Sequence, residues 1–186
     1  MKKISLVSST RADFGLLRNL INKLRKSPFF KLRLLVTGSH LSAKHGNTYR
    51  EIIDEKIQID SKIKIKIFED SNEGISLSIA DTIKKFTQEF NDNKPDILIL
   101  LGDRYEIFAV ASAAYTLGIP IAHIHGGEVT AGSLDEGFRH SISKFSSLHF
   151  AATNEYRRRI IQLGENPKNV FNVGGLSLDN IMKKNL

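Results

Sequence analysis

The apolar run Ile97-Leu98-Ile99-Leu100-Leu101, followed at once by Gly102-Asp103-Arg104-Tyr105-Glu106, decides the fold class of this sequence. Five consecutive large apolar residues leave no polar side on either face, which is typical of a strand in a parallel sheet covered by helices on both faces. Similar short apolar segments recur along the chain. The candidate strands are 3–8, 32–37, 62–68, 96–101, 119–124, 147–151 and 169–173.

Amphipathic helical patterns separate these strands. The apolar positions of two of them are Phe14, Leu17, Leu20, Ile21 and Leu24, and Ile75, Ile79, Ile83, Phe86 and Phe90. Both follow the three- and four-residue spacing of a buried helical face. The alternation predicts an α/β fold, a Rossmann-like, doubly wound and mainly parallel sheet of about seven strands. Ligands of such sheets bind beyond the carboxyl ends of the strands, so functional residues are expected directly after each strand.

Composition excludes several classes of protein. The 186 residues are 41% hydrophobic and contain no cysteine, which excludes disulfides, thiol nucleophiles and zinc–thiolate sites. No apolar run approaches the roughly 20 residues of a membrane span, so we expect a cytoplasmic protein without a membrane partner.

The net charge of +7 comes from 27 Lys and Arg residues against 20 Asp and Glu residues. Part of the excess is the alternating set Lys62, Lys64 and Lys66, which we interpret as the solvated side of an edge strand. A nucleic-acid-binding stripe would need interleaved aromatic residues, and none precedes Phe68. We therefore expect no nucleic-acid partner.

The segment after the first strand, Ser8-Ser9-Thr10-Arg11-Ala12-Asp13-Phe14-Gly15, contains neither a dinucleotide-binding glycine motif nor a P-loop. Thr10 and Asp13 have the spacing of a helix capping box. Arg11, in a strand-to-helix turn beside free backbone N–H groups, is well placed to bind an anion such as a phosphate.

Two later post-strand segments carry acids and histidines. Asp103 and Glu106 are spaced as a helix cap, although a capping carboxylate can also face the crevice. In His123-Ile124-His125-Gly126-Gly127-Glu128, residues two apart in a strand share a side, so the two histidines could act together. With Asp103 and Glu128 they resemble a metal set, but a lone His-x-His is a weak signal and we expect no metal. The glycine pair would let the backbone approach a ligand closely.

The segment Ser133-Leu134-Asp135-Glu136-Gly137-Phe138-Arg139-His140 begins another helix. Ser133 and Glu136 match a capping box, which leaves Asp135 free for chemistry, and Arg139 is spaced to pair with Asp135 along the helix. Asp103, Glu128 and Asp135 thus project from successive post-strand loops. Clustered acids can divide into acid and base roles, which suits proton transfers on an oxygen-rich substrate such as a sugar.

At these residues the chain resembles the N-terminal half of the hydrolysing UDP-N-acetylglucosamine 2-epimerases of the sialic-acid pathway. The matching segments are SSTRADFG at 8–15, LGDRYE at 101–106, HIHGGE at 123–128, GSLDEGFRHSISK at 132–144 and VGGLSLD at 173–179. In this order, and through nearly the whole chain, they are highly specific together.

The resemblance implies one half of a B-type glycosyltransferase-like fold, with residues 1–175 as a Rossmann-like N-terminal domain. Residues 176–186 would begin the interdomain connection, and the second domain would be absent from this chain. The family releases UDP by elimination across C1–C2 of the sugar and then hydrates the glycal to N-acetylmannosamine, without a metal or other cofactor.

The resemblance also implies roles for individual residues and partners. The catalytic acids of the family correspond to Asp103, Glu128 and Asp135, and its phosphate-side arginine corresponds to Arg11. The further candidate substrate-binding residues are Asp13, His123, His125, Gly127 and Arg139. The expected partners are the nucleotide sugar, the C-terminal domain and, in a homodimer, a second copy. The 186-residue chain is expected to fold but not to catalyse alone, because the family's second domain carries most uridine-diphosphate contacts and a catalytic histidine.

Three alternatives stay open. Close relatives act on UDP-diacetamido-trideoxy sugars, and nothing in the sequence decides between these substrates. A non-hydrolysing epimerase would return the UDP-linked product and shares the architecture. A non-catalytic half-domain that binds a nucleotide sugar is the third. The acid and base among the three carboxylates are likewise not assigned by the sequence.

Overall fold

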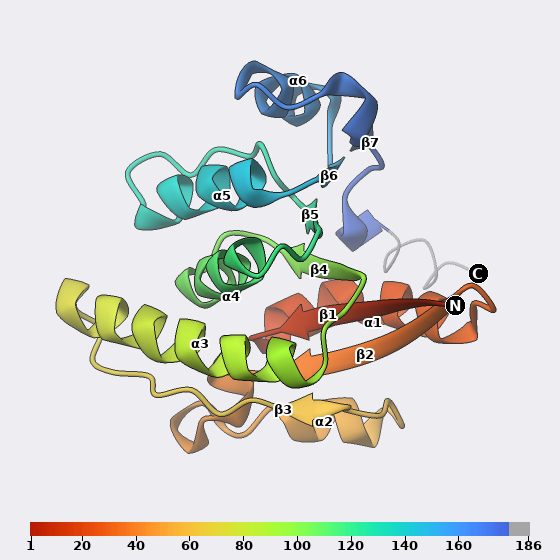
Figure 1. The fold of residues 1–186 in the computed structure, drawn as a ribbon. Helices are drawn as coiled ribbons and strands as arrows, with labels where there is room; N and C mark the ends of the chain where they lie inside the picture. Colours follow the sequence, from red (N-terminus) through yellow and green to blue (C-terminus); the bar gives the residue numbers. More distant parts are fainter. Residues whose placement is uncertain (179–186) are drawn as a thin grey trace.

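The computed structural model describes residues 1–178 as a seven-stranded sheet flanked by helices (Figure 1). The strands are β1 (Lys2–Ser8), β2 (Phe30–Val36), β3 (Ser61–Lys62), β4 (Ile97–Leu101), β5 (Ile121–Ile124), β6 (Leu148–Ala151) and β7 (Val170–Asn172). The α-helices are α1 (Arg11–Lys26), α2 (Tyr49–Asp54), α3 (Asn72–Asp92), α4 (Tyr105–Thr116), α5 (Leu134–Phe145) and α6 (Asn154–Gln162). Short 3₁₀ helices are η1 (Gly38–Leu41), η2 (Ala43–His45) and η3 (Pro167–Asn169).

The strand order is β3-β2-β1-β4-β5-β6-β7, and every neighbouring pair is parallel. The chain runs outward from β1 to β3, returns to β4 beside β1, and then runs outward to β7. This is the predicted doubly wound, Rossmann-like topology, and the switch point lies between β1 and β4. The turns that follow β1, β4 and β5 therefore meet at one edge of the sheet.

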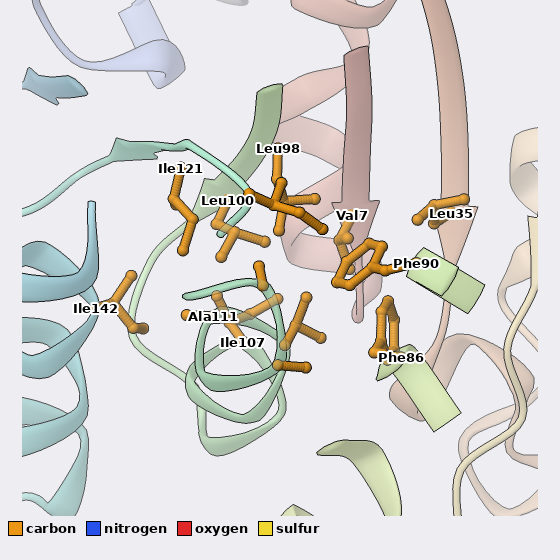
Figure 2. Close-up of a cluster of buried hydrophobic side chains, with 14 of the residues drawn as sticks. Val7, Leu35, Phe86, Phe90, Leu98, Leu100, Ile107, Ala111, Ile121 and Ile142 are labelled. Carbon is orange, nitrogen blue, oxygen red and sulfur yellow. The ribbon is translucent and has the colours of Figure 1, made fainter. Parts of the chain in front are cut away.

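Apolar clusters cover both faces of the sheet, as the unbroken apolar run of β4 predicted. Leu98 and Leu100 pack with α3, α4 and α5, whereas Ile99 and Leu101 pack on the side of α1 and α2. Figure 2 shows the first cluster, in which Phe86 lies toward the strands from α3. At about 25 cal/mol per Å² of buried apolar area, these two clusters are the main source of stability.

The α3 helix confirms the predicted position but shows a shifted buried face. Its fully buried residues are Gly74, Ser78, Thr82, Phe86 and Phe90. Ser78 and Thr82 bury their hydroxyls by donating to the carbonyls one turn earlier, at 2.8 and 2.7 Å. The small side chains at positions 74, 78 and 82 let α3 approach α4 closely. A pattern of apolar residues does not predict that small polar residues occupy the buried face of this helix.

The predicted strand at 62–68 is wrong beyond Lys62, because β2 ends at Val36 and offers the following residues no ladder partner. Side chains of α3 satisfy part of this backbone instead. The carboxylate of Asp81 accepts from Lys66 N at 2.7 Å, and the Ser78 hydroxyl lies 3.1 Å from Phe68 N. The predicted alternation of burial holds nonetheless, with Ile63 buried and Lys64 exposed.

The predicted boundary at residue 175 is not tested by the fold. Residues 176–178 are described, and residues 179–186 of the predicted connection lie outside the described part of the chain. Within residues 1–178, no helix is long and apolar enough to cross a membrane.

Candidate active site

The three predicted carboxylates meet at the carboxyl edge of the sheet. Asp103 follows β4, Glu128 follows β5, and Asp135 lies in the first turn of α5. The charges of Asp135 and Glu128 both raise the pKa of Asp103, so each of the two lies close enough to interact with Asp103. The parallel pairing of β4 with β5, in which Leu101 lies opposite Ile124, brings the first two turns side by side.

Arg139 of α5 forms an ion pair with Asp103, through Nη2 and Oδ2. The side chains of Arg139 and Asp103 are only 7% and 20% exposed, so the pair is largely shielded from water. The predicted pairing of Arg139 with Asp135 is therefore wrong: Arg139 lies on the buried face of α5, toward the β4–α4 turn. Arg139 Nη1 also lies 3.6 Å from Oε2 of Glu136 on the same helix, in a second and longer ion pair.

Asp103 does not cap α4, contrary to one of the two interpretations of its position. The N-cap residue is Arg104, which makes no side-chain capping bond. Glu106, only 1% exposed, pairs instead with Arg104, with Nε–Oε2 and Nη2–Oε1 distances of 3.2 Å each. The Asp103 carboxylate therefore makes no capping bond and pairs with Arg139 at the carboxyl edge of the sheet.

The environments of Asp103 and Glu128 shift their pKa values in opposite directions. Burial raises the pKa of Asp103, and the Arg139 charge opposes this only in part. A hydrogen bond with His125, at 2.9 Å between Nδ1 and Oε1, lowers the pKa of Glu128. Carboxyl groups whose pKa values are driven apart are suited to separate acid and base roles.

His123 and His125 do not act as a pair. The strand ends at Ile124, and His125 has a φ of 64°, so the two-residue alternation stops before it. His123 is fully buried, whereas His125 contacts Glu128 at the crevice. A fully buried side chain does not reach a substrate, so the expectation that His123 binds the substrate is wrong.

The contacts of His123 are internal. Its Nε2 lies 2.8 Å from the Gly102 carbonyl oxygen, and its Nδ1 lies 3.1 Å from Ser143 Oγ. Burial lowers the pKa of His123 to about 4, so the imidazole is neutral near pH 7. Within residues 1–178, no group of three or more potential ligand side chains is arranged to hold a metal ion.

The β1–α1 turn lies at the same edge, because β1 neighbours β4. The capping box is confirmed: Thr10 Oγ1 accepts from Asp13 N, and Asp13 Oδ2 accepts from Thr10 N. Asp13 Oδ2 also accepts from Ser9 N and Oγ, at 3.2 and 2.8 Å, so this carboxylate is engaged in shaping the turn. Arg11 is 73% exposed and pairs with Glu51 of α2 at 2.9 Å.

The glycine pair after β5 is required by packing within the chain. A Cβ on Gly127, whose φ is 77°, would lie 2.3 Å from the Tyr156 carbonyl oxygen. A Cβ on Gly126 would lie 2.9 Å from Ser143 Oγ. The expected approach of this backbone to a ligand is therefore not needed to explain either glycine.

The predicted capping box of α5 forms only in part. Ser133 Oγ accepts from Asp135 N at 3.2 Å, as expected for the N-cap. Glu136 instead accepts from Thr130 N at 2.6 Å and closes the loop that carries Glu128.

Sequence reasoning did not identify His40, which is fully buried in η1. Its Nε2 lies 3.0 Å from Ser8 Oγ and its Nδ1 lies 2.8 Å from Thr48 Oγ1, so it ties the end of β1 to the segment after β2. The signal was a histidine directly after a strand, in Thr37-Gly38-Ser39-His40. A pocket of about 240 Å³ opens nearby, between η1–η2, the segment before α3 and the start of α4.

Comparison with known proteins identifies the family. Residues 22–186 match the family model described as UDP-N-acetylglucosamine 2-epimerase. The chain belongs to this family.

Relatives within the family differ in their stated substrates. The chain is 44% identical to the polysialic acid biosynthesis protein P7 of Escherichia coli, over 100% of its own length and 48% of that protein. It is 43% identical to the hydrolysing GDP/UDP-N,N'-diacetylbacillosamine 2-epimerase of Campylobacter jejuni, over 95% of this chain and 46% of that one. Identity with the UDP-N-acetylglucosamine 2-epimerase of Neisseria meningitidis is 34%, over 96% and 46%. The chain spans about half the length of these relatives.

Solved structures confirm the fold as one Rossmann-like half of a B-type glycosyltransferase fold. UDP-GlcNAc 2-epimerase from Neisseria meningitidis, solved with UDP-GlcNAc bound, superposes with a TM-score of 0.84 at 23% identity, over 97% of this chain and 49% of that one. MurG from Acinetobacter baumannii, which has the B-type glycosyltransferase fold, superposes with a TM-score of 0.61 at 14% identity, over 94% and 45%.

Proposed function

We propose that this chain supplies the acid–base half of a hydrolysing UDP-sugar 2-epimerase. The substrate would be a UDP-linked 2-acetamido sugar, and the products would be UDP and the free 2-epimer. The observation that carries the proposal is the cluster of Asp103, Glu128 and Asp135, with the pKa values of the first two shifted in opposite directions.

The two chemical steps need a base and an acid. In the elimination, a proton leaves C2, the C1–O bond to the diphosphate breaks and a C1=C2 double bond forms. In the hydration, water supplies a hydroxyl to C1 and a proton reaches C2 from the opposite face. Two proton-transfer groups on different sides of the sugar satisfy this course, and each typically contributes about 10²–10⁴-fold in rate.

We assign the base role in the elimination to Glu128 and the acid role in the hydration to Asp103. Glu128 has the lowered pKa and is ionised near neutral pH, which suits proton abstraction. Asp103 has the raised pKa and is the easier of the two to protonate. We propose that Arg11, which is exposed at the same sheet edge and pairs there with Glu51, exchanges this partner for the leaving diphosphate when substrate binds.

The substrate proposal has two candidates. UDP-N-acetylglucosamine, yielding N-acetylmannosamine, follows from the motif resemblance. UDP-N,N'-diacetylbacillosamine is the second candidate, since the Campylobacter jejuni relative named for it is 43% identical, against 34% for the Neisseria meningitidis relative. The uridine contacts are proposed to come from a second domain, because these relatives are about twice as long.

The test is product analysis with both UDP-sugars in D₂O and, separately, in H₂¹⁸O, using the whole enzyme that contains these residues. We expect free UDP without ¹⁸O, because the C1–O bond breaks, and a free 2-epimer with one deuterium at C2. A UDP-linked epimer would indicate the non-hydrolysing reaction. Binding without turnover of either sugar would refute the enzymatic proposal and favour a binding module.

A further inference from the structure

One fully buried imidazole, His123, contacts the three segments that carry the three carboxylates: the turn after β4, the loop after β5 and the helix α5. Its Nε2 lies 2.8 Å from the carbonyl oxygen of Gly102, the residue directly before Asp103. Its Nδ1 lies 3.1 Å from Oγ of Ser143, which is buried in α5, the helix whose first turn holds Asp135.

The third contact is with the loop that carries Glu128. A Cβ on Gly126 would lie 3.0 Å from His123 Nδ1 and 2.9 Å from Ser143 Oγ, so the loop backbone packs directly over the His123–Ser143 hydrogen bond. Any larger residue at 126, or any movement of the imidazole, would displace the segment that leads to Glu128.

These contacts close a ring of interactions around the site. His123 holds the Gly102–Asp103 peptide, Asp103 pairs with Arg139, and Arg139 lies one helical turn before Ser143 on α5. Ser143 then returns to His123. Positions four apart on a helix share a face, so a hydrogen bond that holds Ser143 in place also holds Arg139 at its position beside Asp103.

The hydrogen bonds define the tautomer of His123. The Gly102 carbonyl can only accept, so Nε2 carries the proton and donates. Nδ1 must then accept from the Ser143 hydroxyl. Burial, which lowers the pKa of His123 to about 4, keeps the imidazole in this neutral form near pH 7.

We propose that His123 is a positioning residue of the epimerase site, which sets the relative placement of Asp103, Glu128 and Asp135 without touching the substrate. This rests on the proposed function. Displacements near 1 Å of reacting groups can cost roughly 100-fold in rate, so loss of these contacts is expected to lower kcat. Binding of the nucleotide sugar, which His123 does not contact, is expected to persist.

The experiment compares His123→Phe, His123→Gln and Ser143→Ala with His149→Phe as the matched control. His149 is also buried, at 1% exposure, and lies opposite His123 in the β5–β6 register, but its ion-pair contact is with Glu165. Phe preserves ring volume and removes both hydrogen bonds. Gln retains an amide donor for the Gly102 carbonyl.

We expect His123→Phe to lower kcat about 10- to 100-fold with KM within about threefold, Ser143→Ala to lower kcat less, and His123→Gln to restore part of the loss. His149→Phe should keep wild-type kcat at a similar loss of thermal stability. If His123→Phe does not fold, the kcat values of His123→Gln and Ser143→Ala test the proposal. Equal kcat for wild type and the His123 variants, or an equal loss in His149→Phe, would overturn the proposal.

A readout independent of activity separates this proposal from the proposed function. The pKa of Asp103, followed by NMR of its carboxyl carbon, is expected to move in His123→Phe and Ser143→Ala, because Arg139 and Asp103 change their spacing. It should stay unchanged in His149→Phe. A wild-type protein that releases no UDP refutes the function, whereas an unmoved Asp103 pKa refutes the positioning role.

Discussion

Replacement of Arg139 by Met should destabilise the fold strongly and in a pH-dependent way. Arg139 and Asp103 are 7% and 20% exposed, so the variant leaves a largely buried carboxylate without its partner. Breaking a buried ion pair costs about 3–5 kcal/mol, and the residual exposure of Asp103 places the expected loss near 3 kcal/mol. For a chain of this size, that corresponds to roughly 6–12 °C in Tm.

The pH dependence follows from the raised pKa of Asp103. Burial already raises this pKa in the folded state, and loss of the Arg139 charge raises it further. A carboxyl group with a raised folded-state pKa binds more protons folded than unfolded, so the stability it contributes is lost as pH rises through that pKa. The cost of Arg139→Met should therefore be larger at pH 7.5 than at pH 5.

Urea unfolding followed by circular dichroism at both pH values measures this effect. The control is Arg18→Met, which removes the same charge from an exposed pair with Glu55 and should cost less than about 1 kcal/mol. In the double variant Arg139→Met/Asp103→Asn, the unpaired charge is gone and part of the stability should return. A cost below about 1 kcal/mol for Arg139→Met at both pH values, or a double variant no better than the single one, would refute this account.

Four further predictions follow from the same geometry. In the whole enzyme, Glu128→Gln should lower kcat by about 10²- to 10⁴-fold with little change in KM, and near-normal turnover by this variant would contradict the base assignment. Glu136→Gln should have a mild effect, because its amide oxygen still accepts from Thr130 N. Gly127→Ala should destabilise by more than about 1 kcal/mol in thermal melts, because its Cβ would meet the Tyr156 carbonyl, while Gly137→Ala, in open space on α5, should be neutral or stabilising. The free energy of unfolding in urea should fall as pH drops from 6.5 to about 4, because the lowered pKa of His123 in the folded state makes the unfolded chain bind the proton first. The contribution of His123 alone is roughly 3 kcal/mol, and the fall should be smaller in His123→Phe. The 186-residue chain by itself should bind UDP-N-acetylglucosamine weakly in calorimetry and release no UDP; multiple turnovers by this chain would contradict the proposed need for a second domain.

The sequence was sufficient for the fold class because both sides of the sheet are encoded locally. Continuous apolar runs such as that of β4 are stable only when both faces are covered, and the helices between them carry the matching apolar stripes. It failed at residues 63–68, where alternating lysine and isoleucine look like a strand. Whether such a segment pairs depends on the length of its neighbour, and β2 ends too early.

The side-chain partners of the site were less accessible to sequence reasoning. Glu106 and Asp103 are both spaced for local capping, yet Glu106 pairs with Arg104, and Asp103 pairs with a helix 36 residues away in the chain. Local rules such as capping boxes and four-residue ion pairs describe an isolated helix. They fail for Asp103, whose largely buried carboxylate pairs across the fold with Arg139. Glu106 and Glu136 keep local partners, in Arg104 and Arg139.

By itself, the sequence determined the order of strands and helices, the position of each carboxylate after its strand, and the capping of α1 by Thr10. These features depend on side chains a few residues apart and on the rule that parallel strands present their carboxyl ends at one edge. Only the tertiary structure decided that Arg139 meets Asp103, that His125 meets Glu128 and that His123 is buried among their supports. The contacts of Arg139 and His123 join different strands and helices, and their energies depend on the exclusion of water, which no local pattern specifies. The contact of His125 with Glu128 lies within one turn and depends on the backbone of that turn, where His125 has a φ of 64°.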